Sequence, residues 1–162
     1  MTLRGFLAGL GVVGVCALFS AGFFLFYSHA THIDAMSLLS DFPGYKTKTI
    51  EIGGQRIHIA VADTPALQEL GLGTRSGLGV DEGMLFVFPV EKKYAFWMKD
   101  MHFPIDMIWI SGSGSIVSLA KEVSPDTYPH DFIPTAPARY VLEVVAGYAA
   151  AHGFNVGDTV RL

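Results

Sequence analysis

Aromatic and thioether side chains crowd the stretch between positions 96 and 109, and a few charged groups stand among them. Side chains of this kind line apolar ligand pockets, in which a small number of polar groups fix the orientation of the ligand. The candidate ligand-binding residues are therefore Arg75, Trp97, Lys99 and Asp106. Arg75 could hold an anion through two hydrogen bonds, or pair with an acidic side chain at the surface. The alternative for most of the aromatic cluster is a well-filled hydrophobic core.

A metal site is the second chemistry that the residue types suggest. His102 and Asp106 lie close together in the sequence, and His130 lies in a proline-rich stretch. Imidazole and carboxylate groups bind zinc or a similar ion. However, Pro104 interrupts the strand that would place the first two on one face, and no His-x-x-x-His pair is present. Solvated polar residues around a turn are the favoured interpretation, so we expect no metal and no other cofactor.

The standard catalytic signatures are absent from the sequence. It lacks the G-x-S-x-G motif of many serine hydrolases. The glycine-rich stretch from 71 to 77 has the wrong spacing for a dinucleotide-binding loop and follows a helical pattern. Glu82, Asp106 and Glu143 could supply the two facing carboxylates of a glycosidase, but the sequence does not place them relative to one another. No reaction class follows from these residues.

Charge and cysteine content exclude two further classes. The formal net charge is −4 and the basic residues are scattered, whereas a nucleic-acid surface needs a basic patch. The only cysteine, Cys16, lies in an apolar N-terminal segment. The remainder of the chain therefore has no thiol for catalysis, for a disulfide or for a cysteine-ligated zinc ion.

The elements that must position these groups are mostly short strands. Two strand patterns, Thr47–Ile52 and Gln55–Ala62, flank a Gly-Gly pair, which is a strong hairpin signal. Short helices are expected after Thr64-Pro65 and at 148–152. Further strands are expected at 84–88, 94–99, 105–110, 116–120, 139–145 and 159–162, with a long irregular loop at 124–137. Because regular helical crossovers are missing, residues 45–162 are predicted to form a mainly β, antiparallel sandwich or barrel-like domain.

An uncharged stretch, Phe6–Tyr27, precedes this domain. As a helix its 22 residues would span roughly 33 Å, enough for a bilayer core of roughly 30 Å. Arg4 precedes the stretch and no Lys or Arg follows until Lys46. This asymmetry predicts a cytoplasmic N-terminus and an extracytoplasmic domain.

We therefore interpret residues 1–28 as one N-terminal transmembrane helix, a membrane anchor or uncleaved signal, and residues 29–44 as a stalk or linker. The competing interpretation is a cleaved signal peptide, because Ser28 and Ala30 have the small-x-small spacing that a signal peptidase accepts. The length of the apolar stretch favours the retained anchor, since signal peptides usually have about 7–15 apolar residues.

Six segments of the chain occur in an order that is recognisable. They are Gly71-Leu-Gly-Thr-Arg-Ser, Asp81-Glu-Gly-Met-Leu-Phe-Val-Phe, Phe96-Trp-Met-Lys, Pro104-Ile-Asp-Met-Ile-Trp-Ile, Pro137-Ala-Arg-Tyr-Val-Leu-Glu and Val156-Gly-Asp-Thr-Val. Together they resemble the DUF192 family of small bacterial and archaeal proteins, over nearly all of residues 47–162. The resemblance implies a single mainly β domain, often exported behind a signal or anchor segment. It implies no activity and no catalytic residue, and the cysteines that many relatives have in the 124–137 loop are missing here.

These observations predict a membrane-tethered, extracytoplasmic, β-rich binding or accessory module. Residues 6–27 would contact the membrane, and the ligand would be a small molecule, an envelope saccharide or an envelope protein. The alternative is an envelope enzyme, such as a metal-assisted hydrolase that uses His102 and Asp106.

Overall fold

The computed structural model describes residues 44–162. The predicted membrane anchor and nearly all of the predicted stalk lie outside the described residues. Within residues 44–162, no helix has the length and apolar character needed to cross a bilayer.

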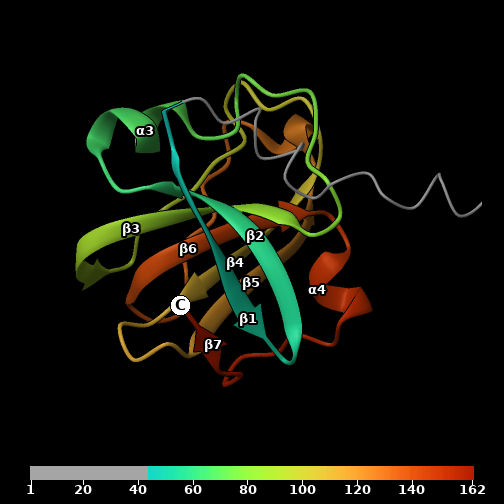
Figure 1. The fold of residues 1–162 in the computed structure, drawn as a ribbon. Helices are drawn as coiled ribbons and strands as arrows, with labels where there is room; N and C mark the ends of the chain where they lie inside the picture. The colour runs from blue at the N-terminus through green and yellow to red at the C-terminus, as the bar shows by residue number, and fades with distance from the viewer. Residues whose placement is uncertain (1–43) are drawn as a thin grey trace, which may run out of the picture. The chain divides into compact units, whose positions relative to one another are not determined.

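Seven strands form one curled, half-barrel sheet in the order β5-β4-β6-β3-β2-β1-β7 (Figure 1). The strands are β1 Lys46–Ile52, β2 Gln55–Ala62, β3 Glu82–Lys92, β4 Ile105–Ile110, β5 Ile116–Val123, β6 Ala138–Val145 and β7 Val160–Arg161. The helices are α3 Pro65–Leu70 and α4 Tyr148–Ala151, with a 3-10 turn at Pro125–Thr127. The mainly β class and the two short helices are therefore confirmed.

The Gly53-Gly54 hairpin is also confirmed. Ile52 pairs with Gln55 directly across the two glycines, and β1 and β2 are antiparallel throughout. Both glycines have positive φ angles, +57° and +83°. A two-residue turn of this type requires that conformation at both positions, and glycine adopts it without strain.

Of the two predicted arrangements, the strands follow the barrel-like one and not the sandwich. They belong to one sheet, and its edges meet at one end through a bridge between Ser115 and Thr159. The antiparallel prediction is wrong for one pair, because β2 and β3 run parallel. A parallel pair needs a long crossover, usually with a helix, and here α3 and the loop after it provide that crossover.

Apolar side chains cover both faces of the sheet. The α4-side core includes Ile50, Ile59, Leu85, Ile108, Leu142, Tyr148 and Phe154. The α3-side core includes Met84, Phe86, Met98, Met107, Trp109 and Val141, with Leu67 of α3 packed against it. Because all six residues of β4 are buried, this strand contributes to both cores.

The predicted strand at 94–99 is wrong. This segment makes only one isolated bridge, between Phe96 and Phe132. The physical reason is that β6 lies between β3 and β4, so both strands that the segment connects already have neighbours on each side. The segment crosses the α3-side core instead, where Trp109 Nε1 donates a hydrogen bond to the Tyr94 carbonyl at 3.0 Å.

Candidate ligand-binding pocket

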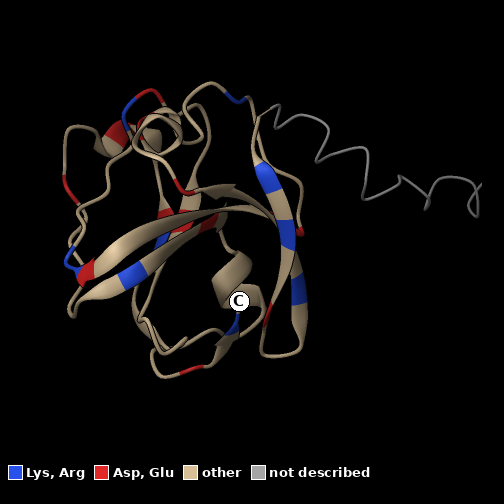
Figure 2. Cartoon of the chain, turned by 60° about the vertical axis from the view of Figure 1, so that its left-hand side comes forward, with Lys and Arg blue, Asp and Glu red and all other residues tan. Residues whose placement is uncertain are grey.

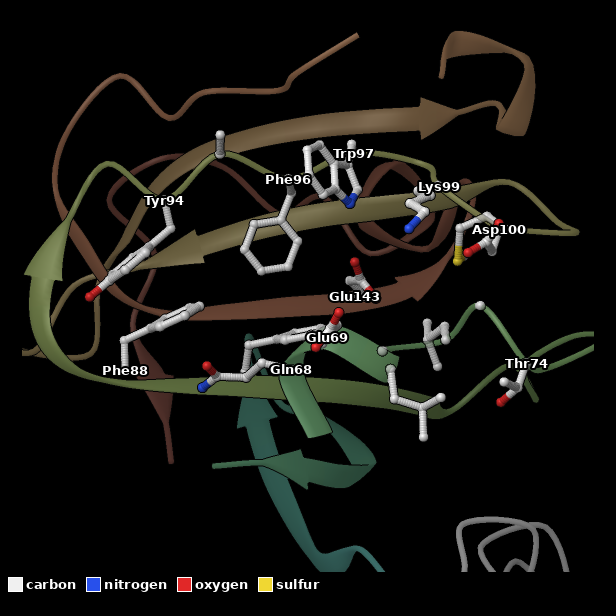
Figure 3. A pocket seen from close by; sticks show the side chains of 17 residues that line it. Gln68, Glu69, Thr74, Phe88, Tyr94, Phe96, Trp97, Lys99, Asp100 and Glu143 are labelled. Atoms are coloured by element: carbon white, nitrogen blue, oxygen red, sulfur yellow. The ribbon is translucent and has the colours of Figure 1, made fainter. Parts of the chain in front are cut away.

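A cavity of about 500 Å³ lies on the α3 side of the sheet. One wall is α3 with the turn at 71–74, and the other is the segment 94–101 (Figure 3). Phe86 and Phe88 of β3 and Glu143 of β6 also line it. Its volume falls within the roughly 300–1,000 Å³ that small-molecule sites occupy.

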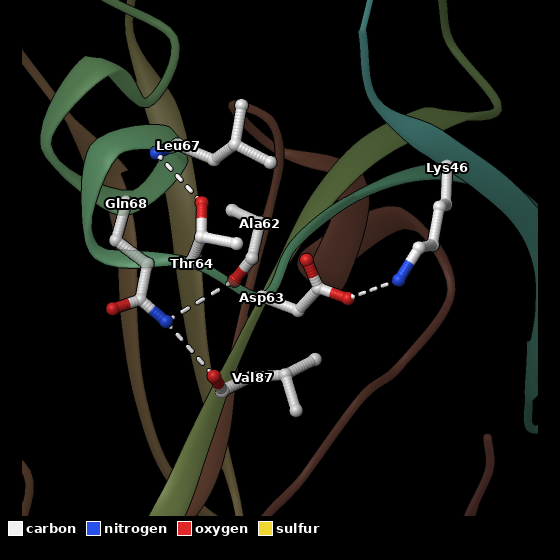
Figure 4. Close-up of polar contacts among 7 residues, drawn as sticks. All are labelled: Lys46, Ala62, Asp63, Thr64, Leu67, Gln68 and Val87. Atoms are coloured by element: carbon white, nitrogen blue, oxygen red, sulfur yellow. Dashed lines mark hydrogen bonds and ion pairs between the residues drawn. The ribbon is translucent and has the colours of Figure 1, made fainter.

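The α3 wall is fixed by polar contacts at its start and in its middle (Figure 4). Thr64 Oγ1 accepts a hydrogen bond from the Leu67 backbone N–H at 3.3 Å, which caps the helix. The Gln68 side-chain amide donates to the carbonyls of Ala62, at 3.2 Å, and Val87, at 2.8 Å. These bonds attach the helix to β2 and β3, so this wall is held by the sheet itself.

The opposite wall is fixed by aromatic packing. Tyr94 stacks on Phe88 with 3.7 Å between ring centroids, and Phe96 packs edge-on against Phe86 at 4.9 Å. The backbone of Phe96 also exchanges two hydrogen bonds with Phe132, at 3.0 and 2.8 Å. An otherwise irregular segment is therefore anchored both to the sheet and to the 124–137 loop.

The two walls approach each other closely at one end of the pocket. A Cβ atom at Gly73 would lie 3.2 Å from the Asp100 Cβ atom and 3.4 Å from its carbonyl oxygen. Asp100 has a positive φ angle of 59°, a conformation that aspartate tolerates better than most residues. The small residue at 73 thus permits this close approach.

Glu143 is the most unusual group in the pocket. Glu143 is only 5% exposed. Its neighbours on the two adjacent strands are Met84 and Met107. Its carboxyl group has no hydrogen bond or ion pair with any other residue of 44–162. Burial raises the pKa of Glu143 from 4.5 to about 8. At neutral pH the pocket therefore contains mainly a neutral carboxylic acid, which ionises if a ligand compensates its charge.

Two of the four predicted ligand-binding residues line this pocket. Trp97 is 55% exposed, and Lys99 is exposed beside it on the same segment. Arg75 is half-buried in the loop after α3 and does not line the cavity. The charge of Arg75 acts on Tyr45 instead. Burial raises the pKa of the Tyr45 hydroxyl, and the charge of Arg75 opposes that rise.

Asp106 lies elsewhere and is fully buried. Its carboxylate accepts hydrogen bonds from three backbone N–H groups, those of Glu122 at 2.7 Å, Gly147 at 3.1 Å and Ala149 at 2.8 Å. These contacts connect β4 to the end of β5 and to the start of α4. Asp106 therefore stabilises the fold, and its oxygens are already engaged.

The predicted metal-site candidates do not form a cluster. His102 and His130 are exposed, and the ring of His130 packs edge-on against Phe132 at 4.8 Å. Among the described residues, no group of three or more His, Cys, Asp or Glu side chains could hold a metal ion.

Glu143 was missing from the predicted ligand-binding residues, although its sequence context carries a signal. It is the single acidic residue in an otherwise apolar run, between Leu142 and Val144. Such a run indicates a strand that is buried on both faces, and a carboxylate is rarely fully buried without a partner or a functional reason.

Comparisons with known proteins establish the family. The DUF192 family model, described as "Uncharacterized ACR", matches residues 48–162, so the chain belongs to this family. Among curated proteins, none matches the chain.

Two solved structures are similar to it, each with 28% sequence identity. The first is a Sinorhizobium meliloti 1021 protein, provisionally described as a transcription regulator, with a TM-score of 0.68; the match covers 72% of this chain and 94% of that one. The second is a Novosphingobium aromaticivorans DSM 12444 protein of unknown function, with a TM-score of 0.69; the match covers 74% of this chain and 88% of that one.

Proposed function

We propose that this chain is a small-molecule-binding module whose ligand occupies the pocket between α3 and the segment 94–101. The observation that carries the proposal is Glu143, a buried carboxyl group without a polar partner among the described residues, in a cavity lined by aromatic rings. A carboxyl group that is largely withdrawn from water and has no hydrogen-bond partner costs free energy. A ligand group that binds it would recover part of that cost.

The proposal includes attachment to a membrane through residues 6–27, with the domain on the extracytoplasmic side. Support comes from the sequence, in which an uncharged stretch long enough to span a bilayer follows Arg4. A tethered binding module could hold its ligand near the membrane or present it to a neighbouring envelope protein.

Nucleic-acid binding is not part of the proposal, although one similar structure is provisionally described as a transcription regulator. Lys and Arg are dispersed among acidic residues in the ribbon view (Figure 2), and the formal net charge is −4. A DNA-binding surface gains most of its affinity from clustered Lys and Arg side chains that contact phosphates.

The metal-assisted hydrolase is less well supported than a binding module. It would need Asp106 as a ligand or base, and both oxygens of Asp106 accept backbone hydrogen bonds. His102 and His130 remain exposed on different segments.

The test is a ligand screen with a variant that fills the pocket. The full chain, in an uncharged detergent, is screened against metabolites and glycans by the shift in melting temperature. Hits should lose their shift in a Thr74→Trp variant, because Thr74 is exposed and lines the pocket. A Ser113→Trp variant, in an exposed turn that does not line the pocket, is the matched control. A panel without hits, or hits that Thr74→Trp leaves unchanged, would contradict the proposal.

A further inference from the structure

The pocket combines a buried acid with aromatic walls, and this combination narrows the ligand class. Building on the proposed binding function, we propose that the ligand is an organic cation whose ammonium group lies against the aromatic rings, with the Glu143 carboxylate as its counter-ion. The proposal rests on the cavity, on the position of Glu143 within it and on the groups that surround it.

The aromatic lining suits a cation. Phe86, Phe96 and Trp97 line the cavity, and Figure 3 shows Phe96 and Trp97 above Glu143 in this view. Aromatic ring faces attract cations, and the attraction is stronger where water is excluded. Met84 and Met107, the sheet neighbours of Glu143, are buried and uncharged and do not line the cavity. The base of the site therefore offers one ionisable group in otherwise apolar surroundings.

The other charged groups that line the cavity are mainly acidic. Glu69 belongs to α3, and the segment 94–101 contributes Lys99 and Asp100. All three are exposed, so solvent screens them more than it screens Glu143. Lys99 is the only basic side chain in the described lining, and it makes no ion pair with Glu143. Two exposed carboxylates and the ionisable Glu143, against one ammonium, favour an incoming cation over an anion.

Tyr94 and Gln68 are less available to the ligand. The Tyr94 hydroxyl donates to the Val90 carbonyl at 2.8 Å, and the Gln68 amide nitrogen is bonded to two backbone carbonyls. Glu143 is therefore the principal buried polar group that a ligand can engage.

Cation binding should release a proton. Because burial raises the pKa of Glu143 to about 8, the empty pocket holds a neutral acid at pH 7. A bound ammonium group stabilises the carboxylate, so the acid proton leaves to solvent as the cation enters. Affinity should consequently rise with pH until Glu143 is ionised in the free protein.

The experiment uses two small molecules of the same shape. Choline carries a quaternary ammonium group that does not titrate, and 3,3-dimethylbutan-1-ol is its uncharged carbon analogue. Binding of each to the full chain, in an uncharged detergent, is measured by calorimetry. We expect choline to bind and its affinity to rise on the order of 100-fold from pH 6 to pH 9. The neutral analogue should bind much more weakly and without this pH dependence.

Three variants identify the groups responsible. Glu143→Gln should weaken choline binding at pH 9 and abolish its pH dependence, whereas Asp126→Asn, an exposed carboxylate in the 3-10 turn outside the pocket lining, should leave affinity unchanged. Lys99→Gln should strengthen choline binding, because it removes the one positive charge at the pocket mouth. An anionic ligand would respond to Lys99→Gln in the opposite direction.

The outcomes separate this inference from the function on which it rests. Equal binding of the two probes, pH-independent choline binding, or no choline binding at pH 9 would overturn the cation assignment. If other ligands then still lose binding in Thr74→Trp, the pocket remains a ligand site of a different class. If no ligand responds to Thr74→Trp, both proposals fail.

Discussion

At the scale of single residues, two buried carboxylates have opposite roles. Asp106 accepts three backbone hydrogen bonds, whereas Glu143 has no such partner within the described chain. Backbone N–H groups satisfy the oxygens of the first carboxylate, whereas the second is desolvated without such bonds. The two residues should therefore respond differently when their charge is removed.

The pH dependence of the free energy of unfolding should reveal that Glu143 is buried. Its pKa is about 8 in the folded chain against an ordinary 4.5. Between these values the folded state binds more protons than the unfolded state, so the free energy of unfolding falls as pH rises. The stabilising contribution is complete below pH 4.5 and is lost as the pH passes 8, at roughly 1 kcal/mol per pH unit.

Urea unfolding of the wild-type chain and of Glu143→Gln at pH 5, 7 and 9 measures this effect. We expect the glutamine variant to gain relative stability at each step upward in pH, because its side chain stays neutral. Glu69→Gln, at an exposed position on α3, should follow the wild type. Parallel pH profiles for wild type and Glu143→Gln would show that the acid is not buried in this way.

Replacing Asp106 should destabilise the fold directly. Asp106→Asn keeps the shape but turns an amide donor toward backbone N–H groups, so we expect a loss of about 3 kcal/mol in the free energy of unfolding. Asp126→Asn, at an exposed position in the 3-10 turn, should change it little. Denaturant midpoints measure the difference, and faster amide exchange at Gly147 and Ala149 should accompany it. Equal midpoints for the two variants would exclude a structural role for Asp106.

At the scale of elements, local sequence signals predict an element well only when the segments that it pairs with are its neighbours in the sequence. The Gly53-Gly54 hairpin follows from two neighbouring strand patterns and a turn that glycine favours. The continuous apolar run of 94–98 gives no warning that β6, some forty residues later, occupies the position beside both β3 and β4. Pairing between distant strands decides where such a segment lies.

The candidate site illustrates the same limit. Trp97 and Lys99 were predicted from local aromatic density, and both line the pocket. Asp106 lies in the same local stretch, but the alternating side-chain directions of β4 and the fold of 122–149 direct it to backbone donors instead. Glu143 reaches the pocket only because β6 inserts between β3 and β4, which no short motif encodes.

The pairing of β3 with β6 leaves no room for a side chain at one position. A Cβ atom at Gly83 would lie 2.7 Å from the Glu143 carbonyl oxygen and 3.2 Å from Leu142 and Val144 atoms. We expect Gly83→Ala to lower the free energy of unfolding by about 1–3 kcal/mol, since backbone must shift to relieve the overlap. Because the backbone that must shift includes Glu143, ligand binding in the pocket should weaken as well.

Gly77→Ala is the matched control for this substitution. Nothing lies within 4 Å of a Cβ atom at Gly77, and its φ angle is not in the positive range. Alanine should therefore be neutral there or slightly stabilising. Thermal and urea unfolding of the two variants give the comparison, and a Gly83→Ala chain as stable as Gly77→Ala would contradict the predicted overlap.

At the scale of the whole molecule, the two faces of the sheet serve different purposes. On the α4 side, side chains from all seven strands, from α4 and from Phe154 form a continuous apolar core. On the α3 side, the covering segments leave a cavity with one buried acid. The first face is therefore a closed core, whereas the second combines apolar packing with a cavity of ligand size.

The remaining prediction concerns the position of the domain relative to a membrane. Cys16 is the only cysteine of the chain, so a Cys16→Ser background permits single-cysteine labelling. In intact spheroplasts, a membrane-impermeant maleimide should label Lys93→Cys, at an exposed position just after β3. It should label Thr2→Cys only after lysis, because Arg4 and the following apolar stretch predict a cytoplasmic N-terminus. Protection of Lys93→Cys until lysis would overturn the topology, whereas a shorter, labelled chain that washes off the membrane would indicate a cleaved signal peptide instead of an anchor.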